Sequence, residues 1–503
     1  MSEQKSSQGE KQRYRSSFGA TLLFSGVQFY QIFIRVIKSK FIALFIGPAG
    51  MGISSLLHTT AELISASTNL GLKTSGVKTV SSAYADNDHA TIAKTVTVLR
   101  RLIMLTGLIG TAICAIFAPL WSNVSFGSDE YVGAFIFVSL LILFEQLNNG
   151  ELVLLQGMRQ KKSLARANVI GQTLSLLWTV PLYYFYGLKA IVWVLVLSPL
   201  IAFCISRYYT YKLKLDTAKV TWWETFQIGR EMIKLGFFLS LQFMMQHVIV
   251  FIIRNFVSAR GGVEEVGLYS AGTAIVTIYL GLVFSAIATD YYPRLAATKS
   301  NEELSFAVHT QAEISILLFA PLIVAFFVFI KPIIILLYSD KFLPIEGMMY
   351  WAVGATLMQA MGWAVSYTLL AKAKPYQFFL NEVLASCYTV PLRLVGYATF
   401  GLTGFGIATL IGFSIYLVQV LFVTRRLFQF SYSGTIWRLF FLFNIPVMST
   451  ALLKNFLPTI WGYIAGSLVL IATTLYMLRQ LNQKMGLKAL MYKRLKLNRN
   501  EIE

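Results

Sequence analysis

The feature that most constrains this chain is a series of apolar runs, each about 20 residues long, that continues over nearly its whole length. A helix of about 20 residues crosses the ~30 Å hydrocarbon core of a bilayer, so each run predicts one membrane-spanning helix. Ten-residue segments of alternating polarity are absent, which argues against an outer-membrane barrel. Composition agrees, because 56% of the 503 residues are hydrophobic and only 13% are charged, too few polar residues to cover a soluble protein.

The fold class predicted from these runs is an all-α polytopic membrane protein with about 14 transmembrane helices. We expect two pseudo-symmetric six-helix lobes followed by a C-terminal helix pair, which Pro446, Lys454 and Pro458 interrupt. The predicted spans are 18–46, 50–72, 98–120, 131–157, 167–187, 190–211, 234–258, 266–290, 307–337, 345–371, 376–400, 402–424, 437–455 and 459–479.

Short loops join these spans, so no soluble domain is expected. In chain order, the sequence predicts a cytoplasmic N-terminal tail (1–17), an N-lobe (18–211) and a cytoplasmic linker (212–233). A C-lobe (234–424), an extra helix pair (437–479) and a basic cytoplasmic tail (480–503) follow. The N-terminal tail lacks a signal-peptide cleavage pattern, so the first apolar run is expected to be a retained helix.

The net charge of +20 is interpreted as a topology signal and not as a nucleic-acid footprint, because Lys and Arg concentrate in cytoplasmic loops of membrane proteins. An N-terminus inside the cell places most basic residues on the cytoplasmic side, among them Arg159, Lys161, Lys162, Arg166, Arg207, Lys212, Lys214 and the C-terminal tail. The outer side receives Lys189, Arg260, Lys331, Lys341 and Lys454. We therefore expect a multi-pass protein of the bacterial inner membrane with both termini in the cytoplasm.

Sequence motifs for catalysis or metal binding are absent. The three cysteines, Cys114, Cys204 and Cys387, lie inside apolar runs at spacings that suit neither a zinc cluster nor a disulfide framework. No nucleotide-binding P-loop and no long external loop is present. We therefore expect a transporter and not an enzyme, with no metal site and no bound cofactor.

Polar side chains form one stripe on each of five predicted helices, at helical spacing. An ionisable residue inside a bilayer costs about 2.5–3.5 kcal/mol on insertion scales, so lipid-facing positions are disfavoured. We expect the stripes to line a shared water-filled cavity or to pair with one another. They comprise Gln28, Gln31, Arg35 and Lys38; His58, Glu62, Ser65 and Asn69; Glu145, Asn148, Asn149 and Gln156; His247 and Arg254; and Glu382, Ser386, Thr389 and Arg393.

The cationic members lie in the outer halves of their helices, which favours an anionic substrate, since Arg binds phosphate bidentately. The predicted substrate-binding residues are Arg35, Lys38, Lys40, Arg254 and Arg393, although Lys40 falls off the stripe of its helix. Candidates for the polar cavity or for coupling are Gln28, Gln31, His58, Glu62, Asn69, Glu145, Asn149, His247, Asp290 and Glu382. Alternative interpretations remain open: snorkelling for the basic residues near helix ends, a structural ion pair for Arg393, and structural roles for the two histidines.

An internal repeat is indicated by two hairpins. Lys38 and Lys40 precede Gly52 of "PAGMGISS" by 14 and 12 residues, and Arg254 precedes Gly267 of "EEVGLYSAG" by 13. Two six-helix halves in parallel repeat would give this pattern, which is a recurring transporter architecture.

Three segments carry a family resemblance: "LFIGPAGMGISSLLHTTAELISASTNLGL", "EEVGLYSAGTAIVTIYLGLVFSAIATDYYPRLAA" and "LLYSDKFLPIEGMMYWAVGATLMQAMGWAVSYTLLAKAKPYQFF". They resemble the Wzx family of O-antigen and polysaccharide repeat-unit flippases, in the MATE-like multidrug/oligosaccharidyl-lipid/polysaccharide exporter superfamily. The resemblance implies a central cavity between two lobes, with Lys40 and Arg254 contacting diphosphate. The extra C-terminal helix pair departs from the twelve helices of many members.

The resemblance also implies a substrate and partners. The substrate would be an undecaprenyl-diphosphate-linked oligosaccharide, flipped to the periplasmic leaflet by alternating access. The partners would be membrane lipids, a polysaccharide polymerase and other assembly proteins. Coupling to a proton gradient, a sodium gradient or the membrane potential is left open. Rival functions are a MATE-type small-cation exporter, a lipid-linked peptidoglycan precursor flippase, and a membrane polymerase or ligase.

Overall fold

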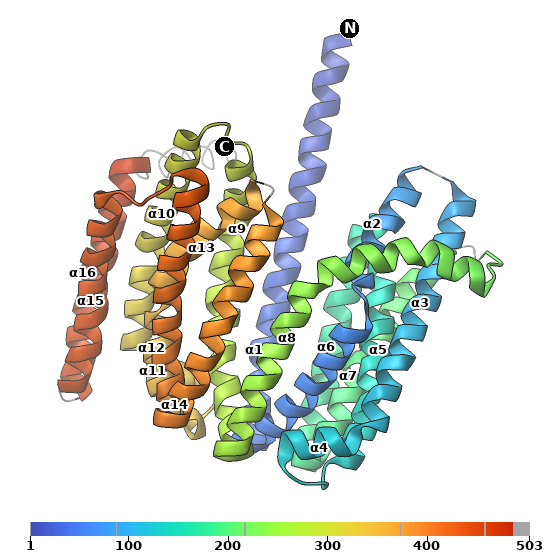
Figure 1. The fold of residues 1–503 in the computed structure, drawn as a ribbon, viewed down its shortest axis with the longest axis horizontal. Coiled ribbons are helices and arrows are strands. Elements are labelled where there is room, and N and C mark those ends of the chain that lie inside the picture. The colour runs from blue at the N-terminus through green and yellow to red at the C-terminus, as the bar shows by residue number, and fades with distance from the viewer. Residues whose placement is uncertain (1, 87, 216–217, 373, 457–458, 486–503) are drawn as a thin grey trace, which may run out of the picture. The chain divides into compact units, whose positions relative to one another are not determined.

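The computed structural model describes residues 2–86, 88–215, 218–372, 374–456 and 459–485. Over these ranges the chain forms helices joined by short turns and contains no strand, as the ribbon in Figure 1 shows. The chain divides into two compact units: a first unit, Met1–Ala271 with Leu337–Phe342, and a second unit, Gly272–Leu336 with Leu343–Glu503.

Helices of the first unit pack around α5, which contacts α1, α2, α3 and α7. Fully buried apolar side chains such as Leu57, Phe135 and Ile142 fill the core between them. The helices are α1 (Ser2–Thr68), α2 (Leu72–Ala85), α3 (His89–Ile116), α4 (Ala118–Phe126), α5 (Val132–Gly157), α6 (Lys161–Tyr186), the 3-10 turn η1 (Gly187–Ala190), α7 (Ile191–Tyr211) and α8 (Trp222–Ala274).

In the second unit, α14 packs on α12 and α13, and α10 contacts α13. The predicted extra pair corresponds to α15 and α16, which lie side by side in Figure 1 and pack on α10 as well as on each other. The helices are the π-helical η2 (Ile275–Leu280), α9 (Gly281–Ala296), α10 (Asn301–Val328), α11 (Ile330–Leu337), the 3-10 η3 (Asp340–Ile345), α12 (Glu346–Gly354), α13 (Thr356–Ala371), α14 (Pro375–Phe428), α15 (Gly434–Phe456) and α16 (Thr459–Met485).

Four of the apolar helical segments are twice as long as one membrane crossing requires. They have 43, 51, 54 and 53 residues, against about 20 for a single crossing. Each bends at a glycine with positive φ, a conformation that glycine adopts without steric cost. The bends lie at Gly47 (φ 63°), Gly187 (φ 51°), Gly262 (φ 78°) and Gly401 (φ 58°), so each long segment is a hairpin of two predicted spans.

The positions of these bends reveal the internal repeat that the two hairpins indicated. Gly262 follows Gly47 by 215 residues, and Gly401 follows Gly187 by 214. The same kind of bend therefore recurs at the same place in two successive halves of the chain. This spacing agrees with the predicted fold class of two six-helix repeats plus a helix pair, while the exact lobe boundaries stay a prediction.

Several helix boundaries differ from the predicted ones. The structure starts α3 at His89 and not at 98, because the Asp88 side chain accepts a hydrogen bond from the Ala90 backbone N–H and caps the helix. In α9 the helix continues past Asp290 to Ala296 with Pro293 inside it, because a proline can kink a helix without ending it. The predicted N-terminal tail is already helical, since α1 begins at Ser2. Most of the predicted C-terminal tail lies outside the described residues.

The start of α8 falls at Trp222, inside the segment 212–233 that was predicted as a linker. A capping box sets this start: the Glu224 carboxylate accepts hydrogen bonds from the backbone N–H and the hydroxyl of Thr221, and that hydroxyl accepts one from the Glu224 N–H. Such reciprocal bonds satisfy the free donors of the first helical turn. The same bonds lower the pKa of the Glu224 carboxyl.

Glycines allow the second half of α1 to approach α8 backbone to backbone, on both sides of the bend at Gly262. A Cβ atom placed on Gly52 would lie 1.8 Å from the carbonyl oxygen of Val263, and one placed on Gly267 would lie 1.8 Å from that of Pro48. The internal repeat relates these two contacts. Pro48 and Val263 directly follow the bends at Gly47 and Gly262, and Gly52 and Gly267 each lie five residues after a bend. At the opposite end of the pair, a Cβ on Gly236 would lie 2.3 Å from the carbonyl oxygen of Leu70.

We expect Gly52→Ala to destabilise the protein by about 1–3 kcal/mol, because the added methyl group must displace backbone. Thermal unfolding of the purified protein in detergent measures the change. Gly133→Ala on α5 is the matched control, since a Cβ there meets nothing within 4 Å and alanine favours helix. Equal unfolding temperatures for the two variants would contradict this account of the helix pair.

The capping box predicts a pH dependence at the start of α8. A carboxylate whose pKa is lowered by folding stabilises the folded state above its ordinary pKa of 4.5 and loses that contribution as the pH falls toward the folded value. Amide exchange of residues 221–233 should therefore be faster in Glu224→Gln than in wild type at about pH 6, with a smaller difference at about pH 3.5. Glu231→Gln on the exposed face of α8 is the control, and an unchanged difference across this pH range would refute the prediction.

Candidate functional site

A group of ionisable side chains lies between the second half of α1 and the first half of α8, within the first unit. The two segments run antiparallel, because Arg254 contacts Ser55 while His247, two turns earlier on α8, reaches Glu62, two turns later on α1. The sequence stripes place His58 and Glu62 on one face of α1, and His247 and Arg254 on one face of α8. Packing of the helices brings the two stripes together.

The centre of this group is one carboxylate oxygen between two imidazole rings. Glu62 Oε2 lies 3.4 Å from His58 Nδ1 and 4.0 Å from His247 Nδ1. The accessible fractions of the side chains are 31% for Glu62, 40% for His58 and 35% for His247. The three side chains, which we call the His–Glu–His cluster, are therefore partly buried and still reachable from outside the unit.

The guanidinium of Arg254 lies beside this cluster and bonds only to neutral groups. Arg254 Nη1 donates to the Ser55 carbonyl at 3.3 Å and to the Thr59 hydroxyl. Its Nε is buried and has no acceptor among the described residues. Within that part of the chain no carboxylate lies within ion-pair distance of Arg254. A guanidinium in this state retains an unused donor for an anion.

A third helix contributes Glu145 to the same surroundings. This residue of α5 is half-buried, and its carboxyl group interacts electrostatically with His58, Glu62, His247 and the exposed Lys73 of α2. Helices α1, α5 and α8 thus each place at least one ionisable group in this region. Three of the five stripes predicted from the sequence therefore meet in the first unit.

The basic residues of the first half of α1 point to other neighbours. Lys38 is half-buried, and its Nζ lies 3.5 Å from the hydroxyl groups of Ser175 on α6 and Ser198 on α7. Lys40 donates to the Tyr338 carbonyl at 2.6 Å, which agrees with its position off the stripe. Arg35 is exposed.

Four further polar candidates of the first unit are at most half-buried. Gln28 is exposed, and Gln31 and Asn149 are half-buried. The Asn69 side chain accepts a hydrogen bond from the Gly71 N–H at 2.8 Å, so it stabilises the turn between α1 and α2 as asparagine commonly does.

The remaining predicted site residues belong to the second unit, where each has a local partner. Glu382 accepts a hydrogen bond from the Tyr416 hydroxyl at 2.7 Å. Arg393 stacks its guanidinium 5.5 Å from the centre of the Phe405 ring. Asp290, with 81% of its side chain accessible, pairs with Arg294 at 3.5 Å one turn along α9.

Sequence reasoning missed one buried charge cluster. Glu151 on α5 accepts hydrogen bonds from Arg100 on α3 at 3.1 and 3.0 Å, from Arg207 on α7 at 2.9 Å, and from the Thr210 hydroxyl. The topology prediction counts Arg207 with the cytoplasmic loop charges, and Arg100 is among the basic residues that it places on the cytoplasmic side. The available signal was their position, since each falls within a predicted span, near its cytoplasmic end, as Glu151 does.

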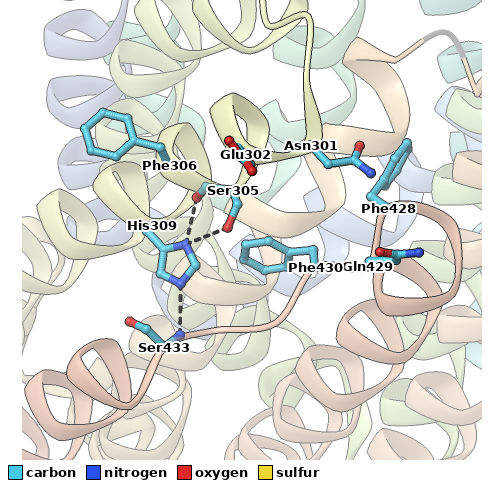
Figure 2. Close-up of a pocket in the computed structure, with 9 residues that line it drawn as sticks. All are labelled: Asn301, Glu302, Ser305, Phe306, His309, Phe428, Gln429, Phe430 and Ser433. Carbon is cyan, nitrogen blue, oxygen red and sulfur yellow. Dashed lines mark hydrogen bonds between the residues drawn. The ribbon is translucent and has the colours of Figure 1, made fainter.

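A separate pocket of about 630 Å³ opens in the second unit, between the start of α10 and the segment that joins α14 to α15. Figure 2 shows His309 at its wall, where Nε2 accepts a hydrogen bond from the Ser433 N–H at 2.9 Å and Nδ1 lies 2.7 Å from the Ser305 carbonyl. Glu302 is the charged residue among those that line it, and neither Lys nor Arg does. Its chemistry therefore does not favour an anionic substrate.

Comparison with protein families gives one match, to a family described as polysaccharide biosynthesis protein, over residues 41–346. The match covers more than half of the chain and includes the segments that carry His58, Glu62, Glu145, His247 and Arg254, whereas Lys38 lies just before it. No curated protein sequence matches the chain significantly.

Solved structures of several transporters share this fold. The lipid II flippase MurJ, in an inward closed conformation, gives a TM-score of 0.73 at 13% identity over 92% of this chain and 99% of the MurJ chain. An inward-facing multidrug resistance MATE family transporter of the MOP superfamily gives 0.66 at 16% identity over 79% and 94%. A MOP superfamily transporter from Pyrococcus furiosus gives 0.56 at 14% identity over 82% and 95%. The predicted fold class is confirmed.

The Glu151 cluster yields a stability prediction. Only 6% of the Glu151 side chain is accessible, and its removal would leave two arginines without their carboxylate, which costs about 3–5 kcal/mol for a buried pair. Because 45% of the Arg207 side chain is accessible, solvent reduces this cost. We expect Glu151→Ala to lower the free energy of unfolding by about 3 kcal/mol, the lower end of that range. Thermal unfolding measures the effect, with exposed Glu130→Ala as control, and a loss equal to the control would contradict a structural role.

Proposed function

We propose that this chain, which belongs to the family of polysaccharide biosynthesis proteins, is a flippase for an undecaprenyl-diphosphate-linked oligosaccharide. The glycan would be the repeat unit of an O-antigen or of another surface polysaccharide, moved from the cytoplasmic to the periplasmic leaflet of a bacterial inner membrane. Family membership supports the pathway, and the fold shared with MurJ and MATE transporters supports transport as the activity.

The observation that carries the proposal is a pair of half-buried cations with neutral partners in membrane-spanning segments. Arg254 bonds to a carbonyl and a hydroxyl, and Lys38 lies against two serine hydroxyls. Within the described residues neither has a carboxylate within 4 Å. Uncompensated charge in a bilayer is costly and marks functional sites. An anionic substrate supplies the missing counter-charge.

A diphosphate suits these groups better than other anions do. Arginine offers several donors in a planar fork, and lysine adds a compact charge, so together they recognise phosphate oxygens. The polyprenyl chain of such a substrate stays in the lipid, and only the diphosphate and the glycan need a polar path. We propose that alternating access of the two repeats provides that path. Membrane potential assists, at about 2.3 kcal/mol per charge per 100 mV.

Two rival functions have different requirements. A MATE-type exporter of small cations needs carboxylates free to bind cation, whereas Glu62 lies between two histidines and near Arg254. A flippase for a lipid-linked peptidoglycan precursor would use the same diphosphate chemistry, and only the polysaccharide family membership argues against it. On our proposal a polysaccharide polymerase and other assembly proteins act on the flipped product.

Reconstitution in liposomes tests the function. We expect the protein to move a fluorescent undecaprenyl-diphosphate oligosaccharide between leaflets, and we expect Arg254→Ala to slow this movement about 10- to 100-fold. A charge-assisted hydrogen bond contributes about 1.5–3 kcal/mol, which corresponds to that factor. Arg254→Lys should retain part of the activity, because it keeps the charge and loses the fork.

Arg260→Ala is the matched control, since Arg260 lies on the same helix and is exposed. Wild-type rates in Arg254→Ala would exclude this residue from the diphosphate site. Failure of the wild-type protein to move any lipid-linked glycan, together with transport of a small organic cation, would replace the flippase by an exporter.

A further inference from the structure

Helix α13 of the second unit has one accessible polar stripe. Between positions 360 and 369 it buries every residue except Trp363 and Tyr367, which are half-buried. Gln359, one turn before Trp363, is half-buried as well. Residues four apart are neighbours on a helix surface, so these three side chains lie on one face. Along that face, α13 leaves an amide, an indole and a phenol accessible.

Aromatic side chains of α9 hold this stripe in place. The centre of the Trp363 ring lies 5.5 Å from that of Phe284 and 5.9 Å from that of Tyr291. Tyr291 is fully buried, and its hydroxyl donates to the Ala364 carbonyl at 2.7 Å. The Trp363 and Tyr367 ring centres are 4.2 Å apart. Packing therefore orients both rings before any ligand binds.

Helix α9 extends the surface with hydroxyl groups. Ser285, Thr289 and Tyr292 are exposed and follow the spacing i, i+4, i+7 of one helix face. The Tyr292 ring centre lies 6.4 Å from that of Tyr367, so this face adjoins the stripe of α13. The Ser285 and Thr289 hydroxyls donate to carbonyls of their own helix, and their oxygens retain lone pairs that can accept another hydrogen bond. The six side chains, which we call the aromatic–hydroxyl surface, are Ser285, Thr289, Tyr292, Gln359, Trp363 and Tyr367.

Contact with lipid does not suit this surface. Gln359 lies at the middle of the predicted span 345–371, where an amide in hydrocarbon would lack hydrogen-bond partners. Trp and Tyr do gather at the two interfaces of a membrane. Trp363, however, precedes the end of α13 at Ala371 by about 12 Å along the helix axis. The surface therefore calls for a polar ligand.

A charged ligand does not suit the surface either. None of its six side chains carries a charge near pH 7. The nearby Asp290 and Arg294 lie on another face of α9, by helical spacing, and pair with each other at 3.5 Å. Charge complementarity therefore favours a neutral ligand, and the hydroxyl and amide groups favour one that is rich in hydroxyl groups.

We propose that the aromatic–hydroxyl surface binds the glycan of the lipid-linked substrate. The proposal rests on the proposed flippase function and assigns the sugar part of its substrate to the second unit. A sugar ring has faces of C–H groups with partial positive charge, and the face of an aromatic ring is negative. Trp363 and Tyr367 stack on such a face, while the hydroxyl and amide groups bond to the hydroxyls at the edge of the sugar. These hydrogen bonds distinguish one glycan from another, because a mismatch leaves a polar group without a partner.

Titration calorimetry in detergent with two ligands tests this assignment. One ligand is the lipid-linked repeat unit extracted from the bacterium that makes this protein. The other is synthetic undecaprenyl diphosphate, which has the lipid and the diphosphate without the sugar. In wild type we expect the glycan to raise the affinity on the order of tenfold. Trp363→Leu should remove this preference and leave the affinity for undecaprenyl diphosphate unchanged, whereas Trp363→Phe, which keeps an aromatic face, should retain part of it.

Two further variants complete the design. Trp351→Leu is the matched control, because Trp351 belongs to α12 of the same unit, is 39% exposed and lies outside the surface. Tyr292→Leu is a second test variant at the exposed edge of the surface, where a replacement leaves the packing of Phe284 and Tyr291 intact. It should lower the affinity for the repeat unit alone, by a smaller factor than Trp363→Leu does.

The outcomes separate this proposal from the flippase. Equal affinity of wild type for the two lipids, or a preference that persists in both Trp363→Leu and Tyr292→Leu, overturns the glycan surface and leaves the flippase intact. Equal losses for the two lipids in these variants have the same meaning.

If neither lipid binds to wild type, the result counts against the flippase. The surface is then decided with the free oligosaccharide, released from the repeat unit by mild acid. Saturation-transfer NMR should detect contact of this oligosaccharide with wild type and not with Trp363→Leu. Contact with neither protein, or equal contact with both, overturns the proposal.

Discussion

The close approach of the second half of α1 to α8 is the interaction on which the candidate site depends. The absence of a Cβ at Gly52, Gly267 and Gly236 lets backbone meet backbone at both ends of the helix pair. Between those contacts, the short distance lets His247 reach Glu62 and lets Arg254 reach Ser55. Larger side chains at the glycine positions would separate the stripes and leave His247 and Arg254 without their partners on α1.

Charged side chains inside the first unit have two kinds of partner. Around Glu151, two arginines and a threonine hydroxyl satisfy one carboxylate, which is the pattern of a structural clamp between α3, α5 and α7. Around Arg254 and Lys38, cations lie against neutral oxygens. The contrast supports our proposal that the second group is the functional one, because a charge that the fold does not compensate must be compensated by a ligand or tolerated at a cost. Residue type alone does not distinguish the Glu151 cluster from the group of Arg254 and Lys38. The two differ in whether the groups bonded to the charge are themselves charged.

Much of the fold could be predicted because the length of an apolar run is a local property of the sequence. Spans such as 376–400 and 402–424 meet at Gly401, where the structure bends α14. Deviations occurred where a capping side chain decided the boundary: Asp88 extended α3, and the Thr221–Glu224 box extended α8 into the predicted linker. Such caps involve one or two hydrogen bonds, and a hydropathy pattern does not register them.

The sequence by itself determined the approximate number and position of the membrane-spanning segments and the face of its helix on which each polar residue lies, since these follow from helical periodicity and the thickness of a bilayer. Only the tertiary structure decided which faces meet. It joined the stripes of His58, His247 and Glu145 in the first unit, paired Glu382 with Tyr416 in the second, and turned Lys40 toward Tyr338. The reason is physical: spacing along a helix fixes the direction of a side chain about its own axis, but the identity of its neighbour depends on how several helices pack together.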